Sequence, residues 1–174
     1  LGPERFVNTE VGAKWEPVPR LLMTVAAYDL VRSNSAAPSA LDPGVIVQTG
    51  KQNTKGVELS LSGSPAVRWD VMAALATQRA RIVSRTSSAP AGARVPLVPE
   101  RTFSLWNRFQ LHDLLGVGLG AISQTQVFAA IDNTVVLPGF WRFDAALYLG
   151  SVGRLSAQVN VENLLNADYF PTSH

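Results

Sequence analysis

Strict alternation of apolar and polar residues near the end of the chain constrains its fold most. In residues 155–162, LSAQVNVE, every second residue is Leu, Ala or Val and the residues between them are polar. Successive side chains of a β-strand point to opposite faces, so this stretch predicts a strand with one apolar and one polar face. In a soluble sheet the apolar face meets a protein core. In an outer-membrane barrel it meets lipid, and the polar face meets the lumen.

The composition favours the membrane alternative without a transmembrane helix. Charged residues make up 16% of the 174 residues, against roughly 25% in an average soluble domain. Hydrophobic residues make up 47% and the mean hydropathy is +0.12, but no run reaches the roughly 18 apolar residues of a spanning helix. Short alternating stretches with few charges are typical of a membrane β-barrel, and they also suit a β-sandwich.

Short and long connections alternate along the chain. The short ones, residues 16–20, 62–68, 111–115 and 150–154, are rich in Pro, Gly, Ser or Asp, as tight turns are. A transmembrane barrel alternates short periplasmic turns with long outer loops, whereas a Greek-key sandwich has no reason to do so. The sequence therefore predicts an all-β, antiparallel up-and-down meander that forms part of a transmembrane barrel. Its eight strands are expected at about 6–16, 20–33, 45–62, 68–86, 100–110, 115–126, 139–150 and 155–164. A break at residues 49–56 would make nine.

Parity sorts the side chains of these strands onto two faces. The face expected to meet lipid carries Val57, Leu59, Leu61, Val71, Leu75, Phe143, Leu147, Val159 and Val161. The lumen-facing charges are expected to be Asp29, Glu58, Arg68, Asp70, Arg142, Asp144 and Glu162. Cross-strand ion pairing in a polar interior is the first role expected for these charges, and docking of a plug is the second. Two residues break the pattern, since Asn107 shares the apolar face and Trp106 shares the polar face.

Tryptophans are expected near the ends of the strands. Trp15 and Trp69 lie beside short turns, and Trp141 lies beside a long connection. Trp and Tyr collect at the two bilayer interfaces of a membrane barrel. We interpret these residues as parts of two aromatic girdles, with ordinary strand aromatics as the alternative.

Four stretches carry a family resemblance. They are VQTGKQNTKGVELSLSG (47–63), VPLVPERTFSLWNRF (95–109), LPGFWRFDAALYL (137–149) and VNVENLLNADYF (159–170). Together, in this order, they resemble the C-terminal barrel of TonB-dependent outer-membrane receptors, and the ferric-siderophore type matches best. The resemblance, and not the strand pattern, implies import of a ferric siderophore across the outer membrane of a Gram-negative cell, energised by the inner-membrane TonB complex. Haem and cobalamin remain alternative cargoes.

The resemblance also implies what surrounds this chain. The family fold is a barrel of about 22 strands filled by a plug domain. The chain begins with LGPERF and ends with PTSH, so we expect residues 1–174 to be a fragment of the C-terminal barrel domain, with the plug and the last strand absent. TonB would act through the missing N-terminal region. Ligand contacts are expected in outer loops at 33–45, 86–99 and 126–138.

Few sites of other kinds are indicated. The net charge of +2 is too small to indicate nucleic acid. There is no cysteine, and His112 and His174 lack metal-ligand spacing. The stretch GVGLG (116–120) has no following helix, so we interpret its glycines as lumen-face positions that a plug could approach closely. We expect no enzyme, no cofactor and no metal. The open alternatives to a receptor are a passive porin and a soluble β-sandwich binding module.

Three arginines share the parity of the apolar face. Arg79, Arg81 and Arg85 follow the apolar positions of the stretch that begins at Trp69. A charge on the lipid face costs about 2–4 kcal/mol at mid-bilayer and almost nothing at the interface. The bilayer should therefore end near Thr77, and we expect these arginines to contact lipopolysaccharide phosphates or simply to be solvated.

Overall fold

A single curved antiparallel sheet dominates the computed structural model, which describes residues 2–38, 42, 44–85, 90–152 and 155–172. The eight strands of the sheet are β1 Arg5–Val18, β2 Leu21–Pro38, β3 Ile46–Ala66, β4 Trp69–Ile82, β5 Arg101–His112, β6 Leu115–Gln124, β9 Phe140–Val152 and β10 Leu155–Val161. They pair in the order β1-β2-β3-β4-β5-β6-β9-β10. Among the described residues, the only other sheet is a two-stranded one, formed by β7 Val127–Phe128 and β8 Val136–Leu137.

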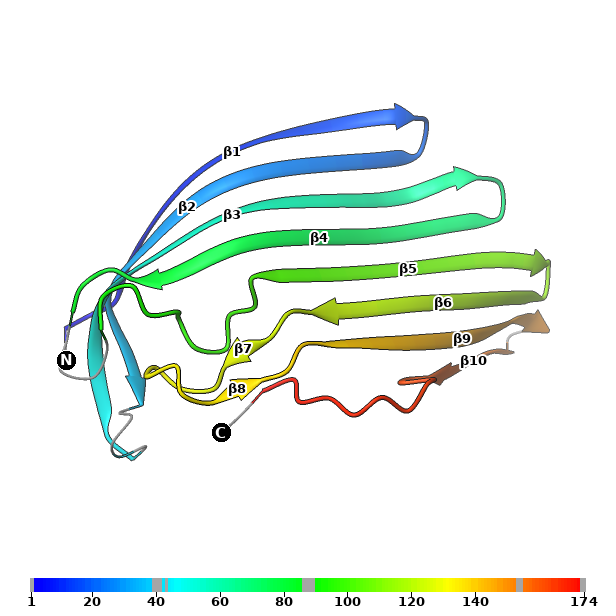
Figure 1. The fold of residues 1–174 in the computed structure, drawn as a ribbon. Coiled ribbons are helices and arrows are strands. Elements are labelled where there is room, and N and C mark those ends of the chain that lie inside the picture. Colours follow the sequence, from blue (N-terminus) through cyan, green and yellow to red (C-terminus); the bar gives the residue numbers. More distant parts are fainter. Residues whose placement is uncertain (1, 39–41, 43, 86–89, 153–154, 173–174) are drawn as a thin grey trace.

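The sheet is an open part of a barrel. Each neighbour in the sheet is also the next large strand in the chain, which is an up-and-down meander. Tight turns lie at one end and long connections at the other, together with both termini (Figure 1). β1 and β10 each pair on one side only. Because no second large sheet packs on the first among the described residues, the β-sandwich alternative is wrong. The described chain also contains no helix able to cross a membrane.

The strands at the loop end are longer than expected. β3 runs unbroken through residues 49–56, where a split was the alternative. β2 reaches Pro38, so most of the stretch 33–38 is paired strand rather than outer loop. Irregular register near Ser35 marks the point where β2 bends. The stretch 126–138 holds the small β7–β8 hairpin, which periodicity did not predict because each of its strands has only two residues.

The cross-strand register defines an apolar face and a polar face. Val57 pairs with Ala27 and Thr77, and Leu59 pairs with Val25 and Leu75. This apolar face continues through β5, β6, β9 and β10 with Phe103, Ala121, Phe143, Leu147, Val159 and Val161. The polar face carries Glu58, Ser60, Asp70, Ser104, Arg142, Asp144 and Asn160. The two faces expected from the sequence are therefore continuous from β2 through β6 and on to β9 and β10.

Large side chains on the apolar face are exposed although they are hydrophobic. Leu75, Phe143 and Val159 retain 46%, 38% and 54% of their accessible surface. Val71 differs from the expectation, since only 5% of its surface is exposed. It stands between Trp69, which stacks on Phe109, and Ala73 on the same face. An exposed apolar face of this extent marks a surface that meets lipid or another apolar partner.

Aromatic residues on the apolar face form two groups. Trp69 and Phe109 stack with ring centroids 5.9 Å apart beside the tight turns. Trp141 lies 5.7 Å from Phe103 and 6.1 Å from Phe143, nearer the loop end. This placement at both ends agrees with the girdle interpretation.

Three sequence-based placements need correction. Asp29 pairs with Thr9 and Lys55, and the register puts it on the apolar face rather than on the polar one. Arg68 lies in the turn before β4 with a φ of 66°, where strand parity does not apply, and it pairs with Asp113 at 2.8 Å. Arg85 lies beyond Ile82, the last residue of β4, so parity does not assign it a face either.

The two exceptions to the alternation have local explanations. On the apolar face, the Asn107 carboxamide oxygen accepts a hydrogen bond from the Trp69 indole nitrogen at 3.1 Å. On the polar face, the Trp106 ring lies across Gly118 and Gly120, where an added Cβ would come within 2.4 Å of the ring. Gly118 and Gly120 therefore make room for Trp106 on the polar face, and a close approach of a plug to these glycines stays a prediction.

Candidate functional site

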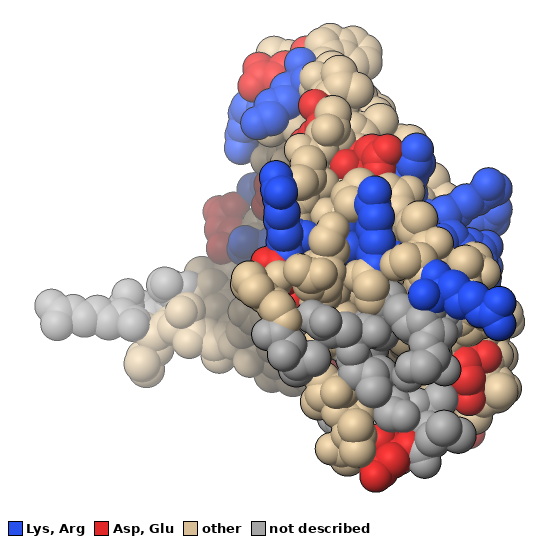
Figure 2. Space-filling model, turned by 90° about the vertical axis from the view of Figure 1, so that its left-hand side faces the viewer, with Lys and Arg blue, Asp and Glu red and all other residues tan. Residues whose placement is uncertain are grey.

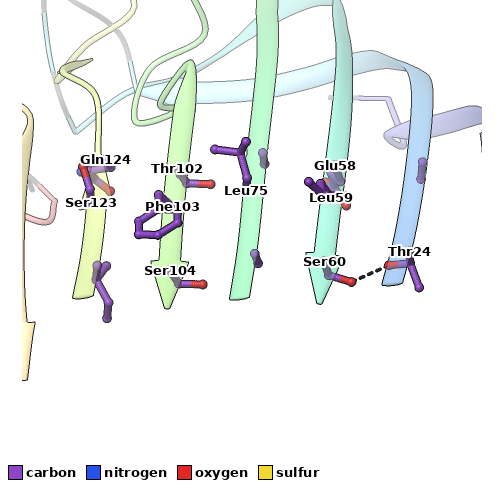
Figure 3. Close-up of a pocket in the computed structure, with 14 residues that line it drawn as sticks. Thr24, Glu58, Leu59, Ser60, Leu75, Thr102, Phe103, Ser104, Ser123 and Gln124 are labelled. Atoms are coloured by element: carbon purple, nitrogen blue, oxygen red, sulfur yellow. Dashed lines mark hydrogen bonds between the residues drawn. The ribbon is translucent and has the colours of Figure 1, made fainter. Parts of the chain in front are cut away.

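Small and polar side chains line a shallow hollow on the polar face. The hollow measures about 280 Å³, and residues from β2 to β6 line it (Figure 3). Hydroxyl groups come from Thr24, Ser60, Thr102 and Ser104, and Thr24 hydrogen-bonds Ser60 across the strands. These hydroxyl groups suit hydrogen bonding to polypeptide or to water.

The charged residues of the polar face are not all paired. Arg142 pairs with Asp144 at 2.8 Å and with Glu162 at 3.7 Å. Asp70 accepts a hydrogen bond of 2.6 Å from Ser64 near the end of β3. Glu58 lies in the hollow and has no hydrogen bond or ion pair among the described residues. Arg142 thus pairs with Asp144 within β9 and with Glu162 just beyond β10, so only the second pair is of the cross-strand kind expected from the sequence.

The segment after β10 turns back onto β9 instead of extending the sheet. The Asn163 side chain closes a turn by donating to the Ala167 carbonyl at 3.0 Å and accepting from its amide at 2.9 Å. Asn163 has a φ of 54°, which asparagine tolerates better than most residues. Its amide donates to Asp144 at 2.9 Å, and the Leu164 amide donates to the Phe143 carbonyl at 2.7 Å.

Tyr169 completes this contact. Its hydroxyl lies 3.2 Å from an Arg142 nitrogen, and its ring centroid lies 4.6 Å from that of Phe140. Two stretches that carry the family resemblance, 137–149 and 159–170, thus bind each other. Their contact holds the segment after β10 at the end of the sheet that carries the long connections.

Two of the expected outer loops form one packed unit. Ile82 at the end of β4 and Ile131 in the later loop expose only 1% and 2% of their surfaces, and Ala93 and Val95 pack on them. Asn133 joins the loops by accepting from the Arg94 amide at 2.7 Å and donating to its carbonyl at 3.0 Å. We call residues 90–100 and 126–138 the paired loops.

Further contacts hold the paired loops together. The Leu97 amide donates to the Phe128 carbonyl at 2.9 Å. The Arg94 guanidinium lies 5.5 Å from the centre of the Phe128 ring and forms an ion pair with Glu100. The two loops therefore form one structural element, and sequence reasoning missed it because no local pattern reports a contact between distant loops.

The described residues show no candidate metal site. No group of three His, Cys, Asp or Glu residues that could hold a metal ion occurs in the described part of the chain. His112 ends β5, and His174 lies outside the described residues, as do residues 86–89 of one expected loop. The geometry offers instead a polar concavity, an apolar exterior and a cluster of loops at one end.

An open, antiparallel meander with an apolar exterior and a polar interior defines a segment of an outer-membrane-type β-barrel. A family model described as "TonB dependent receptor-like, beta-barrel" matches residues 1–164. The chain belongs to the TonB-dependent receptor family. Members of this family are outer-membrane proteins of Gram-negative bacteria, and this chain is part of such a protein.

Several siderophore receptors resemble the chain. The catecholate siderophore receptor Fiu of Escherichia coli K12 is 32% identical over 173 residues, which cover 96% of this chain and 22% of Fiu. The closed-form crystal structure of Fiu superposes with a TM-score of 0.79 at 31% identity, over 98% of this chain and 25% of that one. The pyoverdine-bound FpvA of Pseudomonas aeruginosa gives 0.78 at 27% identity, over 99% of this chain and 24% of that one. The chain thus spans about a quarter of the length of these receptors.

Proposed function

We propose that this chain is the C-terminal barrel part of a receptor that imports ferric siderophores across the outer membrane, energised by TonB. The observation that carries the proposal is the match of residues 1–164 to the receptor barrel, joined to 32% identity with a catecholate siderophore receptor. A plug domain, the segment that engages TonB and the closing strand belong to the remainder of the receptor in this proposal. The complete receptor is a transporter and not an enzyme.

The polar face then lines the lumen. Its charged residues in this proposal are Glu58, Asp70, Arg142, Asp144 and Glu162, while Asp29 and Arg68 are withdrawn for the reasons given above. The unpaired carboxylate of Glu58 and the hydroxyls around it provide hydrogen-bonding groups for a plug. The paired loops and the segment 163–172 surround the outer opening, where a siderophore would enter.

The outer leaflet is a further partner in this proposal. Arg79 and Arg81 share the apolar face of β4 beyond Leu75, and Arg85 follows the end of that strand. Lipopolysaccharide presents phosphates at this level, and the guanidinium group binds phosphate bidentately. We propose lipopolysaccharide as the lipid that these arginines meet.

Iron uptake by cells that carry the complete receptor tests the proposal. We expect radiolabelled iron, supplied as a ferric catecholate, to enter cells that produce both the receptor and TonB. Cells without TonB should show no receptor-dependent uptake, because a plugged barrel needs energy to pass its cargo. Uptake that persists without TonB would support the porin alternative. If haem or cobalamin competes for the receptor and no siderophore does, the imported ligand is haem or cobalamin instead of a ferric siderophore.

A further inference from the structure

Cations stand on the apolar face directly beyond its hydrocarbon-like band. Val57 and Thr77 are cross-strand partners, and the next outward-facing pair is Lys55 and Arg79. On the other side of Thr77, its partner on β5 is Arg101. Lys55, Arg79 and Arg101 are therefore neighbours on one face of three adjacent strands. We call them the basic triad.

Two members of the basic triad, Arg79 and Arg101, keep their charges available. Arg79 and Arg101 are exposed, and neither guanidinium has a hydrogen bond or ion pair among the residues that the structure describes. Lys55 contacts Asp29 at 3.0 Å. The Lys55 ammonium and the Asn53 amide hold the pKa of the Asp29 carboxyl below its ordinary value, so Asp29 stays ionised at neutral pH. Lys55 is thus the one member of the triad with a carboxylate partner among the described residues.

Arg81 differs from Arg79 although both lie on the apolar face. The Arg81 guanidinium lies 3.8 Å from the Glu100 carboxylate, which Arg94 also contacts, and it donates to the Gly92 carbonyl at 3.3 Å. Arg81 is therefore occupied in holding residues 90–100 against β4. The structure separates Arg79, which is free to bind a ligand, from Arg81, which is engaged in the paired loops.

Arg79 and Arg101 would gain from a further anion beside them, since Asp29 contacts Lys55 alone among the three. Like charges placed directly opposite on neighbouring strands destabilise a sheet, and Lys55 and Arg79 are such a pair. Several Lys and Arg side chains project from the loop end of the molecule, as Figure 2 shows. An anionic group bound between the members of the triad would remove the repulsion and would gain charge-assisted hydrogen bonds.

The position of the triad selects the anion. Val57, Leu75 and Phe103 lie on the same face immediately on the membrane side of the triad. A ligand here must have an acyl part beside these side chains and a negative head group beside the cations. Since the family places this surface in the outer membrane with its long loops outside, that head group is a lipid phosphate of the outer leaflet.

We propose that Lys55, Arg79 and Arg101 bind a phosphate of lipopolysaccharide, with Arg79 as the central contact. This inference rests on the proposed function only through the outer-membrane setting, and it sharpens the broader proposal for Arg79, Arg81 and Arg85. It assigns the phosphate to Arg79 and its cross-strand neighbours and assigns Arg81 to the paired loops.

Binding of lipid A to the complete receptor tests the inference. The variant is Arg79→Ser combined with Arg101→Ser, and the control is Arg20→Ser, which removes an exposed charge from a tight turn at the opposite end. Each purified receptor is measured for co-purifying lipopolysaccharide and for binding of lipid A and of dephosphorylated lipid A. Loss of one charge-assisted contact to phosphate lowers affinity about tenfold or more.

The expected result is at least that loss for lipid A in the double variant and no change in the Arg20 variant. Dephosphorylated lipid A should bind weakly and equally to all three proteins. Equal retention of lipopolysaccharide by the double variant and the wild type would overturn the inference, as would wild-type binding of dephosphorylated lipid A that is as tight as its binding of lipid A. Thermal unfolding of each receptor establishes that it is folded. Siderophore uptake, measured on the same proteins, reports separately on the proposed function.

Discussion

A single aromatic side chain explains why β6 carries glycine at alternate positions. The Trp106 ring lies over Gly118 and Gly120 on the polar face, and a Cβ at either position would lie 2.4 Å from a ring carbon. At Gly116 an added Cβ would meet the flexible end of Gln110 at 3.1 Å. The size of the Trp106 ring therefore accounts for Gly118 and Gly120, but not for Gly116.

Gly118→Ala should accordingly destabilise the complete receptor. The added methyl forces the Trp106 ring off its present position, and overpacking of this kind costs about 1–3 kcal/mol in free energy of unfolding. The measurement is urea unfolding of the receptor in lipid vesicles, followed by tryptophan fluorescence. Gly116→Ala is the matched control and should cost clearly less, since the Gln110 side chain can move. Equal costs for the two variants would contradict this account of Trp106.

At the level of single residues, the sequence predicts faces well where alternation is strict and poorly where both parities are apolar. Glu58 stands between Val57 and Leu59, so the alternation predicts the polar face for it. The register confirms that Glu58 lies on the face opposite to Val57 and Leu59. Asp29 was misplaced because β2 carries apolar residues on both faces, including Leu22 and Ala26 beside Val25. Only pairing with β3 resolves that ambiguity.

At the scale of elements, the paired loops should respond as one unit. Asn133 bridges them with two hydrogen bonds to the Arg94 backbone and has a φ of 58°. Asn133→Gly keeps that backbone conformation accessible while removing both bonds. Faster hydrogen exchange is expected at the Leu97 amide, which donates to Phe128 in the other loop.

Asp132→Gly provides the control for this prediction. Among the described residues, Asp132 accepts hydrogen bonds only from Thr134, within its own loop. Its loss should leave exchange at Leu97 unchanged. Exchange at Leu97 that rises equally in both variants would show that the loops are not joined through Asn133.

The strands were predictable from the sequence and the loop contacts were not. Alternation and turn residues are local, so they place the eight strands to within a few residues. Burial of Ile82 against Ile131 joins positions far apart in the chain, and nothing in either loop reports the other. The bond of Arg142 to Tyr169 is of the same kind.

At the scale of the whole molecule, the open sheet leaves backbone hydrogen-bonding groups unpaired along its two edge strands. β1 and β10 each leave one row of backbone groups without a strand partner in the described chain. Unpaired edges promote association with other chains. Residues 1–174 produced alone in detergent should therefore form polydisperse assemblies, measured by light scattering after size exclusion, whereas the complete receptor should be monodisperse. A stable monomer of residues 1–174 would contradict this view of the edges.

The central claim is that the apolar face meets lipid and the polar face lines the lumen. Residues 1–174 contain no cysteine, so single cysteines introduced there can carry spin labels in the complete receptor. The first set of positions, on the apolar face, is 57, 59, 75 and 143. The second set, on the polar face, is 58, 60, 74 and 144. In lipid vesicles, labels on the first set should collide with dissolved oxygen, which partitions into hydrocarbon. Labels on the second set should be shielded from lipid. Equal accessibility to oxygen at both sets, or a reversed pattern, would contradict the assignment of the two faces.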